Sequence, residues 1–218
     1  MLSGNLIRAV GFDVYGVMTV SPYDEMERYA VADGVPPGAM TAAFTTPRWL
    51  EEVQRGTVTV AAYIDEVATE LHQLHGVQLN PSTIATCLET SLTAVPAMVE
   101  LVGAVRKTCR VGLLTNNVRQ SPLWAPMLNE DVFDVIVDAT SGFRKPDKGA
   151  YTALVDALGV PASAVVVVDD SPGNLTPARE LGIHTVLFSD PRHCREELRS
   201  LGIDVAAPGK VKVPPCPH

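Results

Sequence analysis

Polar residues that could do chemistry follow four separate apolar runs of the chain, at the point where each run stops. In a parallel α/β sheet such runs are buried strands, and ligands bind just beyond their carboxyl ends. Each cluster alone has an ordinary explanation as a turn, a charged loop or a helix cap. Gathered at one edge of a sheet, they would form a site. The four clusters are Asp13, Thr115-Asn116-Asn117, Arg144-Lys145-Pro146-Asp147 and Asp169-Asp170.

The side chains in these clusters favour a divalent cation together with a phosphate. Carboxylates that lie close together need a cation, and Mg²⁺ takes one or two of them with substrate oxygens and water. The hydroxyl of Thr115, the backbone amide beside Asn116 and the ammonium of Lys145 suit phosphate oxygens. The sequence therefore predicts a site with an acidic end and a hydrogen-bond-donating end.

The elements that would position these clusters alternate between strand and helix. The apolar run before Asp13 predicts a first strand, and the other runs are separated by segments with helical periodicity. Alternation of this kind predicts βαβ units with right-handed crossovers and a parallel sheet. The later strands are expected at 110–115, 133–137, 165–168 and 183–188, and helices at 98–105, 122–128, 149–158, 175–181 and 192–201.

The stretch between residues 20 and 95 shows only helical patterns, most clearly at 59–75. We therefore predict an α/β fold, in which a Rossmann-like parallel sheet core (1–19 and 96–204) carries an inserted all-helical cap (20–95). The tail 205–218 is rich in proline without periodicity, and we expect it to be flexible. Cap helices are expected at 23–32, 38–44, 47–54, 59–75 and 81–92.

Composition narrows the class of protein. A net charge of −8 over 218 residues gives no electrostatic reason to bind nucleic acid or an anionic membrane. The four cysteines are widely spaced, which argues against a zinc site and fits a reducing compartment. Because Gly4, Asn5 and Arg8 interrupt the N-terminal apolar residues and no run reaches spanning length, we expect a cytoplasmic protein. Nothing in the sequence points to an oligomeric state.

With the four clusters in this order, the sequence resembles the haloacid dehalogenase-like hydrolase superfamily. The likeness is closest from 110 to 187, to the subgroup that holds the phosphatase domain of soluble epoxide hydrolase and bacterial sugar-phosphate phosphatases. The inserted helices match the helical cap of that subgroup, including Trp49 and Gln54-Arg55-Gly56. The matching motifs are Phe12-Asp13-Val-Tyr-Gly-Val, Leu-Leu-Thr115-Asn116, Arg-Lys145-Pro-Asp and Val-Val-Asp169-Asp170-Ser-Pro-Gly-Asn174.

The resemblance implies a nucleophile and a metal site. Asp13 matches the nucleophile that forms an aspartyl intermediate. Its second oxygen, the carbonyl of Tyr15 and the carboxylate of Asp170 would hold Mg²⁺. Asp169 and Asn174 would support these ligands or contact metal-bound water.

The resemblance also implies how a small anionic substrate is bound. Thr115 and the Asn116 amide would bind phosphoryl oxygens, and Lys145 would neutralise Asp13 and the incoming phosphate. In the cap, Arg48 and Arg55 are candidates to meet an anion, as a cap arginine does in dehalogenases. Of these two, we take Arg48 as the candidate substrate-binding residue.

Tyr15 departs from the phosphatase pattern and leaves three functions open. Most phosphatases of the superfamily carry a second Asp at this position as general acid and base, although some of the epoxide-hydrolase-like subgroup replace it, often by Gly. Haloacid dehalogenases begin with Asp-x-Tyr-Gly, and their halide leaves without a proton, but they work without metal and carry Ser-Ser-Asn where this chain has Asp169-Asp170-Ser. A Mg²⁺-dependent phosphatase is therefore the first expectation and a 2-haloacid dehalogenase the second. A catalytically weak or inactive binding protein is the third.

Overall fold

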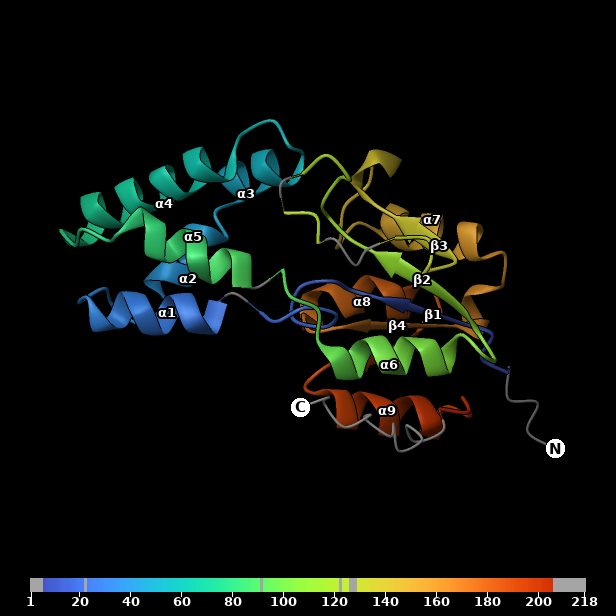
Figure 1. Cartoon of the computed structure of the whole chain (residues 1–218). Helices are drawn as coiled ribbons and strands as arrows, with labels where there is room; N and C mark the ends of the chain where they lie inside the picture. Colours follow the sequence, from blue (N-terminus) through green and yellow to red (C-terminus); the bar gives the residue numbers. More distant parts are fainter. Residues whose placement is uncertain (1–5, 22, 91, 122, 126–128, 206–218) are drawn as a thin grey trace, which may run out of the picture.

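The computed structural model describes residues 6–21, 23–90, 92–121, 123–125 and 129–205. The chain forms a five-stranded sheet with the order β3-β2-β1-β4-β5, and every pairing is parallel. Figure 1 labels β1 to β4 of this sheet. The two inner strands beside β1 carry almost continuous apolar runs, because both faces of the sheet are covered. The strands are β1 (Ala9–Phe12), β2 (Arg110–Leu114), β3 (Val135–Val137), β4 (Val165–Asp169) and β5 (His184–Leu187).

Helices cover both faces of the sheet. One buried cluster joins α6 and α9 to side chains such as Val10 and Phe12 of β1, and a second joins α7 and α8 to the opposite face. In Figure 1, α6 and α9 lie next to each other on one side of the sheet. The helices are α6 (Pro96–Val105), α7 (Lys148–Leu158), α8 (Pro172–Glu180) and α9 (Pro191–Ser200), and two short 3₁₀ turns lie at Ala139–Ser141 and Ala162–Ala164.

The remaining helices, α1 to α5, gather apart from the sheet around a hydrophobic cluster of their own (Figure 1). The longest begins after Thr59, whose hydroxyl accepts from the N–H of Ala62 at 3.1 Å, and ends at Gly76, whose φ is +71°. In sequence, this helical unit is inserted between β1 and α6, so the chain leaves the sheet domain before it and returns to the sheet domain after it. Its helices are α1 (Tyr23–Ala32), α2 (Ala39–Phe44), α3 (Pro47–Gln54), α4 (Val60–His75) and α5 (Pro81–Thr90).

The two connections to the helical unit run side by side. Thr19 pairs with Ala94 in an antiparallel bridge, and the N–H of Val95 donates to the carbonyl of Met18 at 2.9 Å. The predicted fold class, an α/β Rossmann-like core with inserted helices, is confirmed. The boundaries proposed for the two units stay a prediction. We call α1 to α5 the cap below.

One predicted helix is absent over the part of it that the structure describes. The helix expected at 122–128 is wrong for residues 123–125, which are not helical, because the hydroxyl of Ser121 binds the N–H of Leu123 in a turn. The rest of that helix, and the expected flexible tail beyond Val205, lie outside the described residues.

None of the described helices combines the length and apolarity needed to cross a bilayer. A cytoplasmic location stays a prediction.

Candidate active site

Asp13, Lys145 and Asp169 form the buried centre of the site. Asp13 follows β1 directly, and its N–H donates to the carbonyl of Val168 in β4 at 2.9 Å. The ammonium of Lys145 contacts Oδ1 of Asp13 and lies 2.8 Å from Oδ2 of Asp169. The side chains of Lys145 and Asp169 are 3% and 0% exposed. One buried cation therefore compensates two carboxylates.

Asp169 is a fixed counter-charge for Lys145. The amide of Asn174 donates to both of its oxygens, at 3.0 and 3.1 Å, and the N–H of Ser171 donates to Oδ1 at 2.9 Å. With Lys145 on Oδ2, each oxygen of Asp169 has at least two donors. The expected role of Asp169 and Asn174 in supporting the metal ligands stays a prediction.

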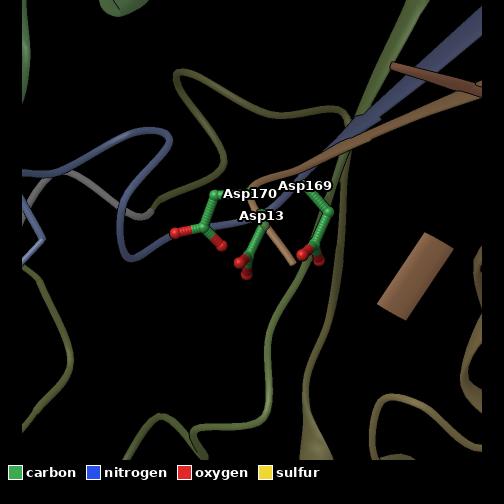
Figure 2. A group of neighbouring side chains, drawn as sticks. All are labelled: Asp13, Asp169 and Asp170. Carbon is green, nitrogen blue, oxygen red and sulfur yellow. The ribbon is translucent and has the colours of Figure 1, made fainter. Parts of the chain in front are cut away.

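Asp170 stands beside this centre and outside its ion pairs. Asp13, Asp169 and Asp170 each offer an oxygen within 4.8 Å of the other two, and Figure 2 shows the three carboxylates converging. No Lys or Arg in the described part of the chain forms an ion pair with Asp170. Gly16, with φ +77°, permits the approach, because a Cβ there would lie 2.0 Å from Oδ2 of Asp170.

The loop after β2 is tied to the loop that carries Lys145. The amide of Asn116 donates to the carbonyl of Lys145 at 3.0 Å and accepts from its N–H at 2.7 Å. Thr115 is buried, and its hydroxyl oxygen accepts from the N–H of Asn117 at 3.2 Å, which leaves the hydroxyl proton able to donate elsewhere. Thr115, Asn116 and Lys145 are thus held at the same sheet edge as Asp13.

Burial dominates the electrostatics of the carboxylates. It raises the pKa of Asp13 to about 7; the charge of Asp169 adds to the rise, and Lys145 opposes it. Burial would lower the pKa of Lys145, but the two carboxylates that it contacts outweigh burial and raise it, so Lys145 stays charged. Burial and the charge of Asp169 also raise the pKa of Asp170. A further cation beside Asp13 and Asp170 would relieve this excess of negative charge.

A cavity of about 310 Å³ joins these groups. Every predicted catalytic and metal-binding side chain lines it, whereas Asp169 is not among the lining residues. A larger groove, about 690 Å³, opens around Arg8 and Arg110 and contains none of the predicted site residues. The core contributes Asp13, Tyr15, Thr115, Asn116, Asn117, Lys145, Asp170, Ser171 and Asn174 to the wall of the 310 Å³ cavity, and the connection and cap contribute Ser21, Tyr23, Leu50 and Gln54.

Tyr15 joins the core to the cap. Its hydroxyl donates to the carbonyl of Leu123, and its ring packs against the hydrophobic clusters of both units. Burial raises the pKa of this phenol well above its usual value. Tyr15 therefore keeps its proton and directs it towards Leu123. The expected role of its carbonyl as a metal ligand stays a prediction.

The two cap arginines singled out in the sequence are not brought to the cavity. Arg48 is exposed, and its guanidinium carbon lies 4.8 Å from the centre of the Trp49 ring. Arg55 is exposed too and pairs with Glu51 at 3.3 Å. Instead, the cap lines the cavity with residues that were not predicted as part of the site. Two of them, Leu50 and Gln54, are four residues apart and share one face of α3.

The C-terminal end of α3 is tied to the core, and this tie positions Gln54. Arg144, which precedes Lys145, donates to Oε1 of Gln54 and pairs with Glu51 at 3.3 Å. The hydroxyl of Ser121 donates to the carbonyl of Val53 at 2.9 Å. The loops that carry Thr115 and Lys145 therefore also hold the cap against the cavity.

The sequence matches a known family over most of its length. A family model described as haloacid dehalogenase-like hydrolase matches residues 7–182. The chain belongs to this family. Membership of this hydrolase family supports an enzyme, as the motifs predicted.

Curated relatives include a phosphatase and several longer proteins. The chain is 28% identical over 208 residues to acyl-CoA dehydrogenase family member 10 of Mus musculus, covering 91% of this chain and 19% of that protein. It is 34% identical over 112 residues to phosphoglycolate phosphatase of Rhodospirillum rubrum (49% and 46%) and 25% identical over 217 residues to bifunctional epoxide hydrolase 2 of Rattus norvegicus (89% and 39%). The chain therefore spans less than half the length of each.

Solved structures of the same family share the fold. A HAD family enzyme of Bacteroides thetaiotaomicron, in complex with magnesium and inorganic phosphate, has a TM-score of 0.60 at 19% identity, covering 84% of this chain and 94% of that one. A defluorinating L-2-haloacid dehalogenase has a TM-score of 0.55 at 19% identity, covering 85% and 86%. At such identities the likeness concerns the fold alone.

The residues of this chain fit a bound Mg²⁺. Both oxygens of Asp169 are occupied by Lys145, Asn174 and a backbone N–H. Asp13 and Asp170 are then the carboxylates on the cavity wall that can ligate, and one or two carboxylates are what Mg²⁺ takes from a protein. Asp170 in addition lacks an ion-pair partner among the described residues.

Proposed function

We propose that the protein hydrolyses a small phosphate monoester with Mg²⁺, through a phosphorylated Asp13. One observation carries this proposal: the carboxylate of Asp170 stands beside that of Asp13, and Lys145, the one ammonium among the described residues of the site, is shared between Asp13 and Asp169. The remaining negative charge calls for a divalent cation, and a metal-free mechanism has no use for Asp170. A relative named phosphoglycolate phosphatase supports the same choice.

Each residue of the sheet edge has a part in this reaction. A carboxylate oxygen of Asp13 attacks phosphorus, the bond to the ester oxygen breaks with that oxygen taking a proton from solvent, and water later hydrolyses the acyl phosphate. The Thr115 hydroxyl, the Asn116 N–H and Lys145 bind the phosphoryl oxygens, so that one anion can approach another. When bound, Mg²⁺ adds positive charge against the phosphoryl group.

Tyr15 favours a second candidate, a 2-haloacid dehalogenase. Its hydroxyl donates to Leu123, so it does not offer the leaving group the proton that an alkoxide needs. Halide leaves without a proton, so a dehalogenase would work with the same residue. Asp13 would then attack carbon, and Asp170 would have no function.

Phosphate release measured with and without Mg²⁺ separates the candidates. We expect hydrolysis of p-nitrophenyl phosphate to need Mg²⁺ and to fall by at least about 10³-fold in Asp13→Asn, which removes the nucleophile. Asp170→Asn should raise the half-saturating Mg²⁺ concentration by more than the roughly tenfold to hundredfold typical of a residue that only supports a ligand. Asp156→Asn, an exposed carboxylate on α7, is the matched control and should behave as wild type.

Two results would contradict the proposal. Mg²⁺-independent release of chloride from a 2-chloroacid, without phosphate release from any ester, would establish the dehalogenase. Turnover of neither substrate, with Mg²⁺ still bound in calorimetry, would favour the binding protein.

A further inference from the structure

The described residues on the cap side of the catalytic cavity are uncharged. The residues that line it there are Ser21, Tyr23, Leu50 and Gln54. Lys145 is the one cation among the described lining residues, and it is already held between two carboxylates. A substrate bound with its phosphate at the sheet edge therefore meets neutral side chains at its other end.

An apolar crevice extends this end of the cavity beneath the cap. It measures about 30 Å³, which is room for about one methyl group or one water molecule. Two of the hydroxyls in its wall are engaged elsewhere, because that of Tyr15 donates to Leu123 and that of Tyr63 donates to Phe44. It shares Tyr15, Tyr23, Leu50 and Gln54 with the cavity and is closed by Phe44, Tyr63, Leu88 and Leu123.

Gln54 adds one directed hydrogen-bond donor to this wall. Its Oε1 accepts from Arg144, and a guanidinium can only donate, so the orientation of the amide is fixed by chemistry. Nε2 is then the end of Gln54 that remains to meet a ligand in the cavity that it lines. An ether, hydroxyl or carbonyl oxygen on the substrate would suit it.

We propose that the cavity selects phosphate monoesters whose leaving group is small and uncharged, with an acceptor oxygen towards Gln54 and an apolar end towards the crevice. This inference rests on the proposed function. An ester with a second anionic group would place that charge against neutral side chains without a partner, which is strongly unfavourable. The protein would then differ from its relative named phosphoglycolate phosphatase, since phosphoglycolate carries a carboxylate.

Arg144 is the further cation that must be considered. It contacts Gln54, but it does not itself line the cavity, and its charge is paired with Glu51 at 3.3 Å. One of its nitrogens, Nη1, is buried without a hydrogen-bond partner. Truncation of Arg144 therefore belongs in the test.

The test compares two esters that differ in charge and hardly in shape, carbamoylmethyl phosphate and phosphoglycolate. With wild-type protein and Mg²⁺ we expect kcat/KM to favour the neutral amide by at least about tenfold, because only the carboxylate must be desolvated without a partner. p-Nitrophenyl phosphate serves as a common measure of turnover. A wild-type preference for phosphoglycolate, or equal kcat/KM values, would overturn the inference.

A cation placed in the neutral wall should change this preference. Leu50→Lys should shift the ratio towards phosphoglycolate by about tenfold or more, through attraction at short range. Ser21→Lys tests the same point from the connecting loop, outside the hydrophobic cluster of the cap. Leu50→Met controls for loss of leucine, and Leu74→Lys, at an exposed position of α4, controls for added charge. Both controls should keep the wild-type ratio.

The remaining outcomes separate this inference from the proposed function. If both lysine variants hydrolyse p-nitrophenyl phosphate but keep the wild-type ratio, the neutral wall does not select the substrate. If Arg144→Met loses phosphoglycolate turnover alone, Arg144 reaches the leaving group and the inference is wrong. If wild type releases phosphate from none of the three esters, the proposed function fails and this inference falls with it.

Discussion

The two walls of the cavity are built on opposite principles. The wall from the sheet is charged and fixed: Lys145 and Asp169 are buried, and each of their charged groups has a defined partner. The wall from the cap is neutral and comes from helices with their own hydrophobic cluster. In the proposed function, the strand ends supply the chemistry and the cap selects the leaving group. Changes to the sheet wall should abolish turnover, whereas changes to the cap wall should redirect it.

Lys145→Met, a change in the sheet wall, should cause the largest loss of stability and of turnover. It leaves Asp13 and the fully buried Asp169 without their cation, and breaking a buried pair in this way costs about 3–5 kcal/mol of stability. Hydrolysis of p-nitrophenyl phosphate should fall by at least about 10³-fold, because phosphate must then approach two uncompensated carboxylates. Urea unfolding and phosphate release measure the two effects.

Lys148→Met is the matched control for that variant. Lys148 also forms an ion pair, with Glu180 at 2.8 Å, but more than half of each side chain is exposed. Exposed pairs contribute less than about 1 kcal/mol, so stability and turnover should stay close to wild type. Equal losses in the two variants would show that the buried charge of Lys145 has no special part.

The sheet wall could be predicted from the sequence almost residue by residue. Asp13, Thr115 and Asp170 each lie at or just beyond the end of an apolar run, and parallel strands bring their carboxyl ends to one edge. The direction of the chain thus determines where these side chains lie. The sequence also predicted Lys145 in the loop after the third strand, although its contact with both carboxylates is a property of the fold.

The cap wall could not be predicted in the same way. A surface helix has several faces, and the face that meets the cavity depends on tertiary packing. Arg48 was the expected residue, but it lies two positions before Leu50, or roughly 200° around an α-helix, and so on another side of α3. The spacing of Leu50 and Gln54 places them on one face of α3, but it does not say which face meets the cavity. They become part of the site because the cap packs against the loops after β2 and β3.

Gly16→Ala should have an intermediate effect, confined to the metal. The new methyl group would take the space of the Asp170 carboxylate, 2.0 Å away, and we expect Mg²⁺ affinity in calorimetry to fall by about tenfold or more. Gly182→Ala is the matched control, because Gly182 has the same φ of +77° but nothing within 4 Å of an added Cβ. Since the two glycines share this φ, the difference between the two variants reports on the contact with Asp170. An equal Mg²⁺ affinity in both would show that Asp170 does not bind the metal.

Tyr15→Phe should have the smallest effect. That result would mean that the Tyr15 hydroxyl helps to hold the structure together and takes no part in the reaction. The change removes a hydrogen bond to the Leu123 carbonyl, which also accepts from the amide of Asn117 at 3.3 Å, so the loss of stability should be about 1 kcal/mol. Tyr63→Phe removes the corresponding bond to Phe44 within the cap and should cost a similar amount. Because the Tyr15 proton points at Leu123, kcat for an alkyl phosphate should change by less than about threefold, whereas loss of a general acid lowers it by about 10²–10⁴-fold. A large loss of kcat on the alkyl ester, with p-nitrophenyl phosphate unaffected, would contradict this prediction. It would show that the hydroxyl leaves Leu123 during turnover and protonates the leaving group, so that Tyr15 would be a catalytic residue.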